Sequence, residues 1–165
     1  SAKAVQVMDA ARRNGALPEE IRKVYAALEK AGFHPVPHST NVGSAIFANK
    51  PGDGSAREQA ASCQRVLGGA ANFACEYATK RYRSNCINWG MLPFLLDTPD
   101  VLEKGDYVFL PGVRAALLNA AENIEAVAVK PDGEVTRFTV RLGDMTDAER
   151  QILADGCLIN YYKNH

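Results

Sequence analysis

The chain has 165 residues, of which 47% are hydrophobic and 23% charged, and its formal net charge is zero. This length and composition fit one globular domain with a core of its own. The balanced charge argues against a dedicated binder of nucleic acid or acidic membranes, which would carry a basic excess. No apolar run reaches the roughly 18 residues of a membrane-spanning helix, and no secretory signal is recognisable, so we expect a cytoplasmic protein.

The cysteines and histidines do not form a metal-binding pattern. No two cysteines are spaced as C-x-x-C, and the histidines lie apart from them in the sequence. We therefore expect no metal site in this chain, no disulfide, and cysteines that act as small buried apolar residues. The residues concerned are Cys63, Cys75, Cys86, Cys157, His34, His38 and His165.

The first 43 residues predict a helical arm followed by a connector. Apolar residues recur at helical spacing over residues 3–13, and Asn14-Gly15 is a typical helix end. Pro18-Glu19-Glu20 is a typical start for a second helix, which Gly32 would end. Residues 33–41 contain two prolines and indicate an extended connector. We take residues 1–43 as the arm and residues 44–165 as the main domain.

The main domain begins with alternating strand and helix patterns. The apolar run 44–48 predicts a buried strand, and a glycine-rich turn follows it over residues 49–54. A helix is expected to start at Ser55 and to end at Gly68-Gly69. A strand of small residues over 70–75 and a helix over 77–88 complete this half.

The later half predicts a β-hairpin between short helices. Residues 106–110 indicate a strand, and residues 114–119 indicate one or two helical turns. Two alternating segments, 124–129 and 135–142, flank a Lys-Pro-Asp-Gly turn and predict a hairpin. One last helix is expected from Thr146 through Tyr161. The mixture indicates an α/β or α+β architecture.

The segment with most chemical content is the glycine turn and the helix start after it. Glycines allow a sharp turn and close approach to a ligand, and a helix N-terminus offers free N–H groups that favour an anion. Arg57 adds a planar fork that matches a carboxylate, and Ser55 adds a hydroxyl at the same place. From spacing alone, Ser55 could be a helix N-cap, part of a phosphate site or a catalytic residue.

Four motifs then indicate a family. Gly54-Ser55-Ala56-Arg57-Glu58-Gln59-Ala60-Ala61 resembles the aconitase signature G-S-S-R-E-H-A. Three further blocks are similar to family elements in the same order, over roughly three quarters of the chain. They are Leu67-Gly68-Gly69-Ala70-Ala71, Asn85 followed by Gly90-Met91-Leu92-Pro93, and Gly156-Cys157-Leu158-Ile159-Asn160.

The resemblance implies a swivelling β/β/α domain, like the C-terminal domain or small subunit of aconitase-family enzymes, that closes over a [4Fe–4S] cluster held elsewhere. It implies that Ser55 is the catalytic base and that Arg57 binds a substrate carboxylate, with Gly54 and Ala56 contributing to the substrate site. The reaction would be the reversible dehydration of a hydroxy di- or tricarboxylic acid. Because the cluster ligands are not in this chain, we expect the isolated domain to be inactive and to bind no cluster.

Three departures from the family pattern bear on the substrate. Ala56 stands where the family has a second serine, and Gln59 stands where it has a histidine. The family's acidic element upstream of the signature is missing from residues 1–43.

The expected partner is a cluster-bearing region, either in the same polypeptide or in a separate large subunit. The helical arm over residues 3–32 and the Asn-Trp-Gly-Met-Leu-Pro segment 88–93 favour the first arrangement, in which this chain is the C-terminal domain of a single-chain hydratase. In the second case this chain would be a stand-alone small subunit like that of isopropylmalate isomerase. A different alternative is a non-catalytic module that binds carboxylates or RNA. The basic segment 80–83 is the feature that could contact RNA, although a solvated helix face is the simpler interpretation.

Overall fold

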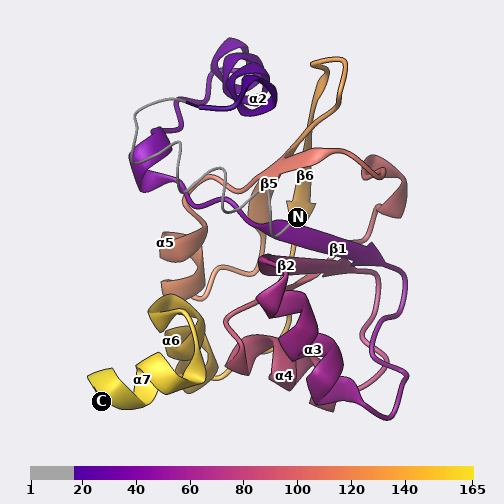
Figure 1. Cartoon of the computed structure of the whole chain (residues 1–165), viewed down its shortest axis with the longest axis vertical. Coiled ribbons are helices and arrows are strands. Elements are labelled where there is room, and N and C mark those ends of the chain that lie inside the picture. Colours follow the sequence, from indigo (N-terminus) through magenta and orange to yellow (C-terminus); the bar gives the residue numbers. More distant parts are fainter. Residues whose placement is uncertain (1–16) are drawn as a thin grey trace.

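The computed structural model describes residues 17–165, and the helix predicted over residues 3–13 lies outside them. The described chain is a mixed α/β structure, as expected (Figure 1). Its elements in order are α2 (Glu19–Lys30), a 3₁₀ turn (Pro37–Ser39), β1 (Ser44–Ala48), α3 (Arg57–Val66), β2 (Gly69–Ala74), α4 (Lys80–Asn88), β3 (Leu92–Leu95), a 3₁₀ turn (Pro99–Val101), β4 (Tyr107–Phe109), α5 (Val113–Leu118), β5 (Ile124–Val129), β6 (Val135–Val140), α6 (Asp147–Asp155) and α7 (Leu158–Asn164).

The strands form two small sheets of different type. Strands β1, β2 and β3 pair in that order and are all parallel, whereas β4, β5 and β6 are antiparallel. Each parallel pair is connected through a helix, α3 between β1 and β2 and α4 between β2 and β3. These two helices lie side by side against the parallel sheet (Figure 1). A bridge between Leu95 and Arg141 joins the two sheets.

The parallel sheet differs from the sequence prediction at both edges. The prediction that β1 is buried is wrong, because Ile46 and Phe47 are 43% and 41% exposed. Within the described chain β1 pairs with β2 alone, so its outer side is uncovered. Strand β3 was not predicted, since Pro93 interrupts a strand pattern. Proline is tolerated there because β3 is also an edge strand.

The predicted hairpin is confirmed. Ile124–Val129 and Val135–Val140 pair in register from Ile124↔Val140 to Val129↔Val135. The backbone bond from the Gly133 N–H to the Lys130 carbonyl closes the turn. Helix α2, which the sequence also predicted, packs its buried Leu28 against β5. Its C-terminal end is further held by Arg137, whose guanidinium donates to the Ala31 carbonyl at 3.0 Å.

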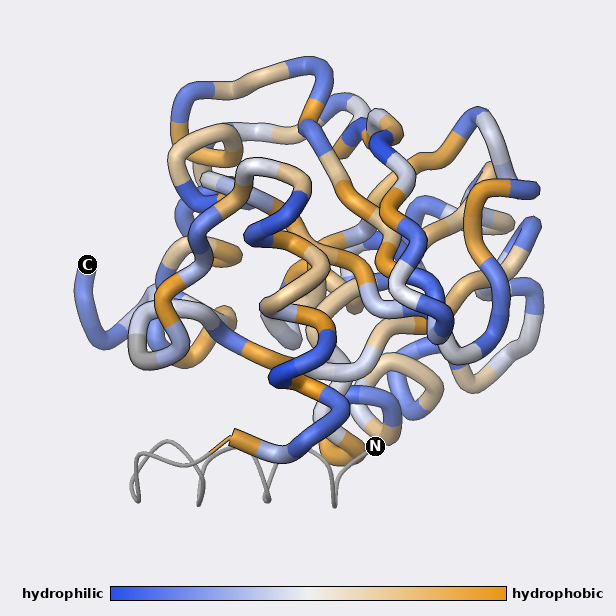
Figure 2. Tube along the Cα trace, turned by 90° about the horizontal axis from the view of Figure 1, so that it is seen from above, coloured by the Kyte–Doolittle hydropathy of each residue, from blue (hydrophilic) through white to orange (hydrophobic). Residues whose placement is uncertain are grey.

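The main core lies where the two sheets, α5 and α6 meet. Phe94 is fully buried and stacks on Phe73 with the ring centroids 5.3 Å apart. Hydrophilic residues gather at the outer turns and at the C-terminus (Figure 2). Helices α5 and α6 are joined at both ends, because Arg114 donates to the Ala154 carbonyl and Arg150 to the Leu117 carbonyl.

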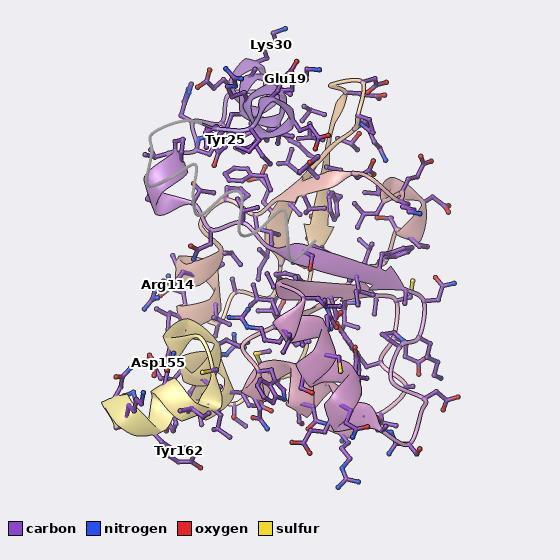
Figure 3. All side chains as sticks on the ribbon, in the orientation of Figure 1. Glu19, Tyr25, Lys30, Arg114, Asp155 and Tyr162 are labelled. Atoms are coloured by element: carbon purple, nitrogen blue, oxygen red, sulfur yellow. The ribbon has the colours of Figure 1, made fainter. Side chains whose placement is uncertain are left out.

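The C-terminal segment is two helices and not the single helix predicted. Thr146 caps α6 with a capping box to Glu149, as a Thr-x-x-Glu pattern favours. Gly156 then adopts a left-handed conformation with φ of 94° and ends α6. Tyr162 on α7 is 73% exposed and does not pack in the core (Figure 3). Among residues 17–165, no helix combines the length and apolar character needed to cross a membrane.

Candidate functional site

The glycine turn, the start of α3 and the start of α4 surround one hollow of about 430 Å³. It is lined by Gly52, Gly54, Ser55, Ala56, Arg57, Ala60 and Tyr82. The four site residues predicted from sequence, 54–57, therefore lie together at one surface concavity. Neither Ser55 nor Arg57 is turned into the core, because Ser55 is exposed and Arg57 is half-buried.

The start of α3 has no side-chain cap. The helix begins at Arg57 with Ala56 at the N-cap position, so the prediction that the helix starts at Ser55 and the N-cap interpretation of Ser55 are both wrong. The Ala60 N–H makes the bond to the Ala56 carbonyl at 3.0 Å. The N–H groups of residues 57–59 precede that bond and have no acceptor inside the helix. The Ser55 hydroxyl lies at the hollow, beside the helix end that carries these N–H groups.

The guanidinium of Arg57 is hydrogen-bonded through its Nε alone among the described residues. Its Nε donates to the Gly52 carbonyl at 3.3 Å. No described residue accepts a hydrogen bond from its two terminal NH₂ groups. The Thr79 hydroxyl donates to the same Gly52 carbonyl at 3.4 Å and also accepts from the Tyr82 N–H, which caps α4. One loop carbonyl therefore connects the starts of both helices.

Gly52 packs directly on Tyr82. Its φ of 94° is in the left-handed region, and a Cβ at this position would lie 2.5 Å from both Cβ and Cγ of Tyr82. A larger residue could not adopt this turn without moving the ring. The glycine thus brings the turn close enough to α4 for the Tyr82 ring to form a wall of the hollow.

Behind Tyr82 lies a buried polar network that sequence reasoning missed. The Tyr82 hydroxyl donates to Oε1 of Gln64 at 3.4 Å, and Nε2 of Gln64 donates to Oδ1 of Asn72 at 2.7 Å. The Asn72 Nδ2 then donates to the Cys86 sulfur at 3.1 Å. Burial raises the pKa of Tyr82 to about 12 and that of Cys86 to about 11. Gln64 and Asn72 are 6% and 1% exposed. The one available signal was Asn72, because it lies in a strand of small and apolar residues.

A scan against models of protein families finds no match to this chain. Among curated proteins, the chain is 31% identical over 128 residues to the methanogen homoaconitase small subunit of Methanocaldococcus jannaschii. The match covers 77% of this chain and 66% of that relative. The chain belongs to the aconitase family.

Other residues near the aconitase signature do not line this hollow. Lys50 forms an ion pair with Glu76 at 3.0 Å. Asp53 and Gln59 are exposed and lie outside the hollow lining. In the basic segment 80–83, Tyr82 is buried and Arg83 donates to the carbonyls of Leu142 and Asp144. Two of the four residues considered for RNA contact are therefore engaged within the fold.

The cysteines of this aconitase-family chain differ in environment. Cys86 is fully buried, as predicted for a small apolar residue. The same prediction is wrong for Cys63 and Cys75, which are exposed, while Cys157 is half-buried. All four are free thiols. Within residues 17–165, no three His, Cys, Asp or Glu side chains are grouped so that they could hold a metal ion.

Proposed function

We propose that this chain supplies Ser55 and Arg57 to the active site of an aconitase-type hydro-lyase. In this proposal it is a swivelling domain that closes over a cluster-bearing region and dehydrates a hydroxy di- or tricarboxylic acid. One observation supports this proposal. The Ser55 hydroxyl, the Arg57 guanidinium with both terminal NH₂ groups available, and the uncapped N-terminus of α3 lie together at one hollow. This combination is suited to binding a small carboxylate and moving a proton beside it.

Arg57 would bind one carboxylate of the substrate. Its Nε is fixed by the Gly52 carbonyl, so the planar fork is oriented before substrate arrives. The two terminal NH₂ groups can then donate in parallel to both oxygens of a carboxylate. Gly54 and Ala56 would contribute through the backbone, because neither side chain has a polar atom.

Ser55 would be the base that takes the proton from the carbon next to a carboxylate. As the carbon–carbon double bond forms, the substrate hydroxyl leaves on the opposite side, toward the partner region. A serine hydroxyl is a weak base in water, so its deprotonated form needs stabilisation. The uncapped N–H groups of α3 and the Arg57 charge provide positive potential at this place.

The [4Fe–4S] cluster belongs to the partner region in this proposal. The described residues do not fit it, because they contain no group of three candidate ligands. The name of the matched relative, a small subunit, supports a separate cluster-bearing subunit as the partner. A cluster-bearing region in the same polypeptide would meet the same requirement. A reading frame with three cluster cysteines, continuous with this chain, would distinguish the second arrangement from the first.

The test uses the complete enzyme with its cluster reconstituted under anaerobic conditions. Hydroxy acids are screened for water elimination by the ultraviolet absorbance of the unsaturated product. We expect Ser55→Ala to lower kcat by about 100- to 10,000-fold, the range for loss of a general base, with an unchanged unfolding transition. Arg57→Lys should mainly raise KM for the substrate, because lysine cannot donate in parallel to both carboxylate oxygens.

Ser62→Ala is the matched control, since Ser62 lies on the same helix and donates only to the Gln59 carbonyl. It should leave both kcat and KM unchanged. Full activity of Ser55→Ala would refute the assignment of the base. A lack of turnover with any hydroxy acid, in an enzyme with a full cluster, would refute the hydro-lyase and favour a non-catalytic binding module.

A further inference from the structure

The first part of the glycine turn is bonded to the segment that leads from β2 into α4. The Glu76 N–H donates to the Asn49 carbonyl, and the Ala78 N–H donates to the Pro51 carbonyl, each at 3.0 Å. These two bonds lie just beyond the ends of β1 and β2, which pair in parallel. The backbone of the turn is therefore held beside the start of α4 as far as Pro51.

The next bond in this series comes from a side chain. The Thr79 hydroxyl donates to the Gly52 carbonyl at 3.4 Å. Within residues 17–165, no hydrogen bond joins residues 53–55 to another element. The Gly52 carbonyl is therefore the last attachment of the turn before Ser55 and the start of α3.

The orientation of the Gly52 carbonyl depends on groups outside the glycine. Glycine allows many orientations of the peptide group that follows it, and Gly52 has a φ of 94°. Its carbonyl oxygen has two lone pairs. The Thr79 hydroxyl donates to this oxygen, and so does the Arg57 Nε, at 3.3 Å. The bond from Thr79 therefore keeps the carbonyl where Arg57 can reach it.

Thr79 is itself fixed by the helix that it caps. Its Oγ accepts from the Tyr82 N–H at 3.2 Å. Because a hydroxyl has one proton, the bond to Gly52 uses its whole capacity as a donor. Thr79 is half-buried and does not line the hollow. It therefore connects α4 to the site without contact with a ligand there.

We infer that Thr79 is a positioning residue, which orients the Arg57 guanidinium for a substrate carboxylate through the Gly52 carbonyl. This inference rests on the proposed function and extends it to a residue outside the hollow. Arg57 would bind the same carboxylate in the substrate and in the transition state. Loss of its orientation should therefore raise KM and leave kcat close to that of the parent.

The experiment measures KM and kcat of Thr79 variants in the complete, cluster-reconstituted enzyme, with the hydroxy acid that it dehydrates. Thr79→Val should raise KM about fivefold, the effect of one hydrogen bond, with kcat within about twofold of the parent. Thr79→Ser keeps the hydroxyl and should return KM to within about twofold of the parent value. A parent-like KM in Thr79→Val, or equal impairment of the valine and serine variants, would overturn the inference.

The matched control is a threonine cap away from the hollow. Thr146 caps α6 by accepting from the Glu149 N–H at 3.2 Å. Loss of either cap should lower the midpoint of denaturant unfolding, so Thr79→Val and Thr146→Val are compared for stability and for KM. We expect both midpoints to fall and KM to rise in Thr79→Val alone. An equal rise of KM in both variants would assign the effect to stability and overturn the positioning role.

A double variant tests whether Thr79 acts through Arg57. In Arg57→Lys no guanidinium remains for the Gly52 carbonyl to orient. Adding Thr79→Val to this variant should therefore change kcat/KM by less than about twofold, because the two substitutions remove the same interaction. A fivefold effect in both backgrounds, about as large as one hydrogen bond, would show that Thr79 acts independently of Arg57.

A binding measurement separates this inference from the proposed reaction. Succinate has no hydroxyl to eliminate, so calorimetry on the same complete protein reports carboxylate binding alone. Thr79→Val should weaken succinate binding about fivefold, whereas Thr146→Val should leave it unchanged. That result in an enzyme that dehydrates no hydroxy acid would refute the hydro-lyase and uphold the positioning role. Equal succinate binding by Thr79→Val and an active parent would refute the positioning role alone.

Discussion

The two sheets of this chain use glycine and buried polar groups differently. Around the parallel sheet, Gly52 and Gly90 leave no space for a Cβ, because Tyr82 and the Gly156 carbonyl occupy it. In the antiparallel half, Gly105 and Gly133 adopt positive φ but have open space around them. The buried amides Gln64 and Asn72 also belong to the parallel half.

The comparison indicates which half of the molecule constrains the position of its backbone more tightly. At Gly105 and Gly133 in the antiparallel half, a glycine is needed only for the direction of a turn, because the space around both is open. In the parallel half the backbone itself approaches other elements closely, and a polar network fixes side-chain positions. The candidate site lies in the parallel half, where close backbone contacts and the polar network both occur. Substitutions there should therefore lower the free energy of unfolding more. Three measurements test this contrast.

The largest effect is expected from an added methyl group at Gly90. A Cβ there would overlap the Gly156 carbonyl, which joins the end of α4 to the α6–α7 junction. We expect Gly90→Ala to lose about 3 kcal/mol or more of unfolding free energy in denaturant titration, from overpacking and left-handed strain together. Gly105→Ala shares the positive φ without the collision and should lose about 1 kcal/mol. Equal losses in the two variants would contradict the contrast.

A smaller effect is expected from removing the centre of the buried network. Asn72→Ala leaves the Gln64 amide without its 2.7 Å acceptor in a buried place. We expect it to lose about 2 kcal/mol of unfolding free energy, measured in the same way. Asn123 is exposed, and Asn123→Ala should change stability by less than about 0.5 kcal/mol. A neutral Asn72→Ala would show that the network is dispensable.

The smallest effect is an alkaline loss of stability that Cys86 should cause. Its pKa is raised by burial from an ordinary value of 9.0 to about 11. The folded state therefore keeps a proton that the unfolded state releases, so stability is full below pH 9 and falls between 9 and 11. From pH 8 to pH 10 this thiol should contribute about 1 kcal/mol of the loss, and Cys86→Ala should remove that contribution.

The control for this pH series is Cys63→Ala, which removes a thiol that is exposed on α3. Burial also raises the pKa of Tyr82 and of Tyr77, so both tyrosines add to the loss as the pH approaches their ordinary value of 10.0. The difference between the parent and Cys86→Ala therefore gives the part of the loss that is due to the thiol. A pH slope that is the same in Cys86→Ala and the parent would assign the alkaline loss to another group.

Local patterns predicted those parts of the fold that local interactions determine. The hairpin followed from two alternating segments around a Pro-Asp-Gly turn, and the start of α6 followed from Thr146 and Glu149. Strand β3 was missed because its pairing partners lie elsewhere in the sequence and Pro93 hides its pattern. The exposure of β1 was missed for a related reason, since an apolar run does not reveal which neighbours will cover it.

The sequence predicted which residues line the candidate site, but not the contacts that hold them in place. The signature placed Ser55 and Arg57 together, and both line the hollow. The helix start was expected two residues early, because serine is a favoured cap and the sequence does not show that Arg57 bonds to the Gly52 carbonyl. The Tyr82–Gln64–Asn72 network joins residues from three elements, and single residues at such distances leave no pattern in a sequence.

The Gly52 carbonyl, which accepts from both Arg57 and Thr79, has a consequence for association with a partner. Since it anchors the turn to two helices at once, the entropy of ordering this turn is lost during folding. Docking of another protein surface onto the hollow then needs no loop rearrangement, and more of the contact energy remains as affinity. In the proposed swivelling enzyme, the turn would therefore enter and leave the shared site without changing its own conformation.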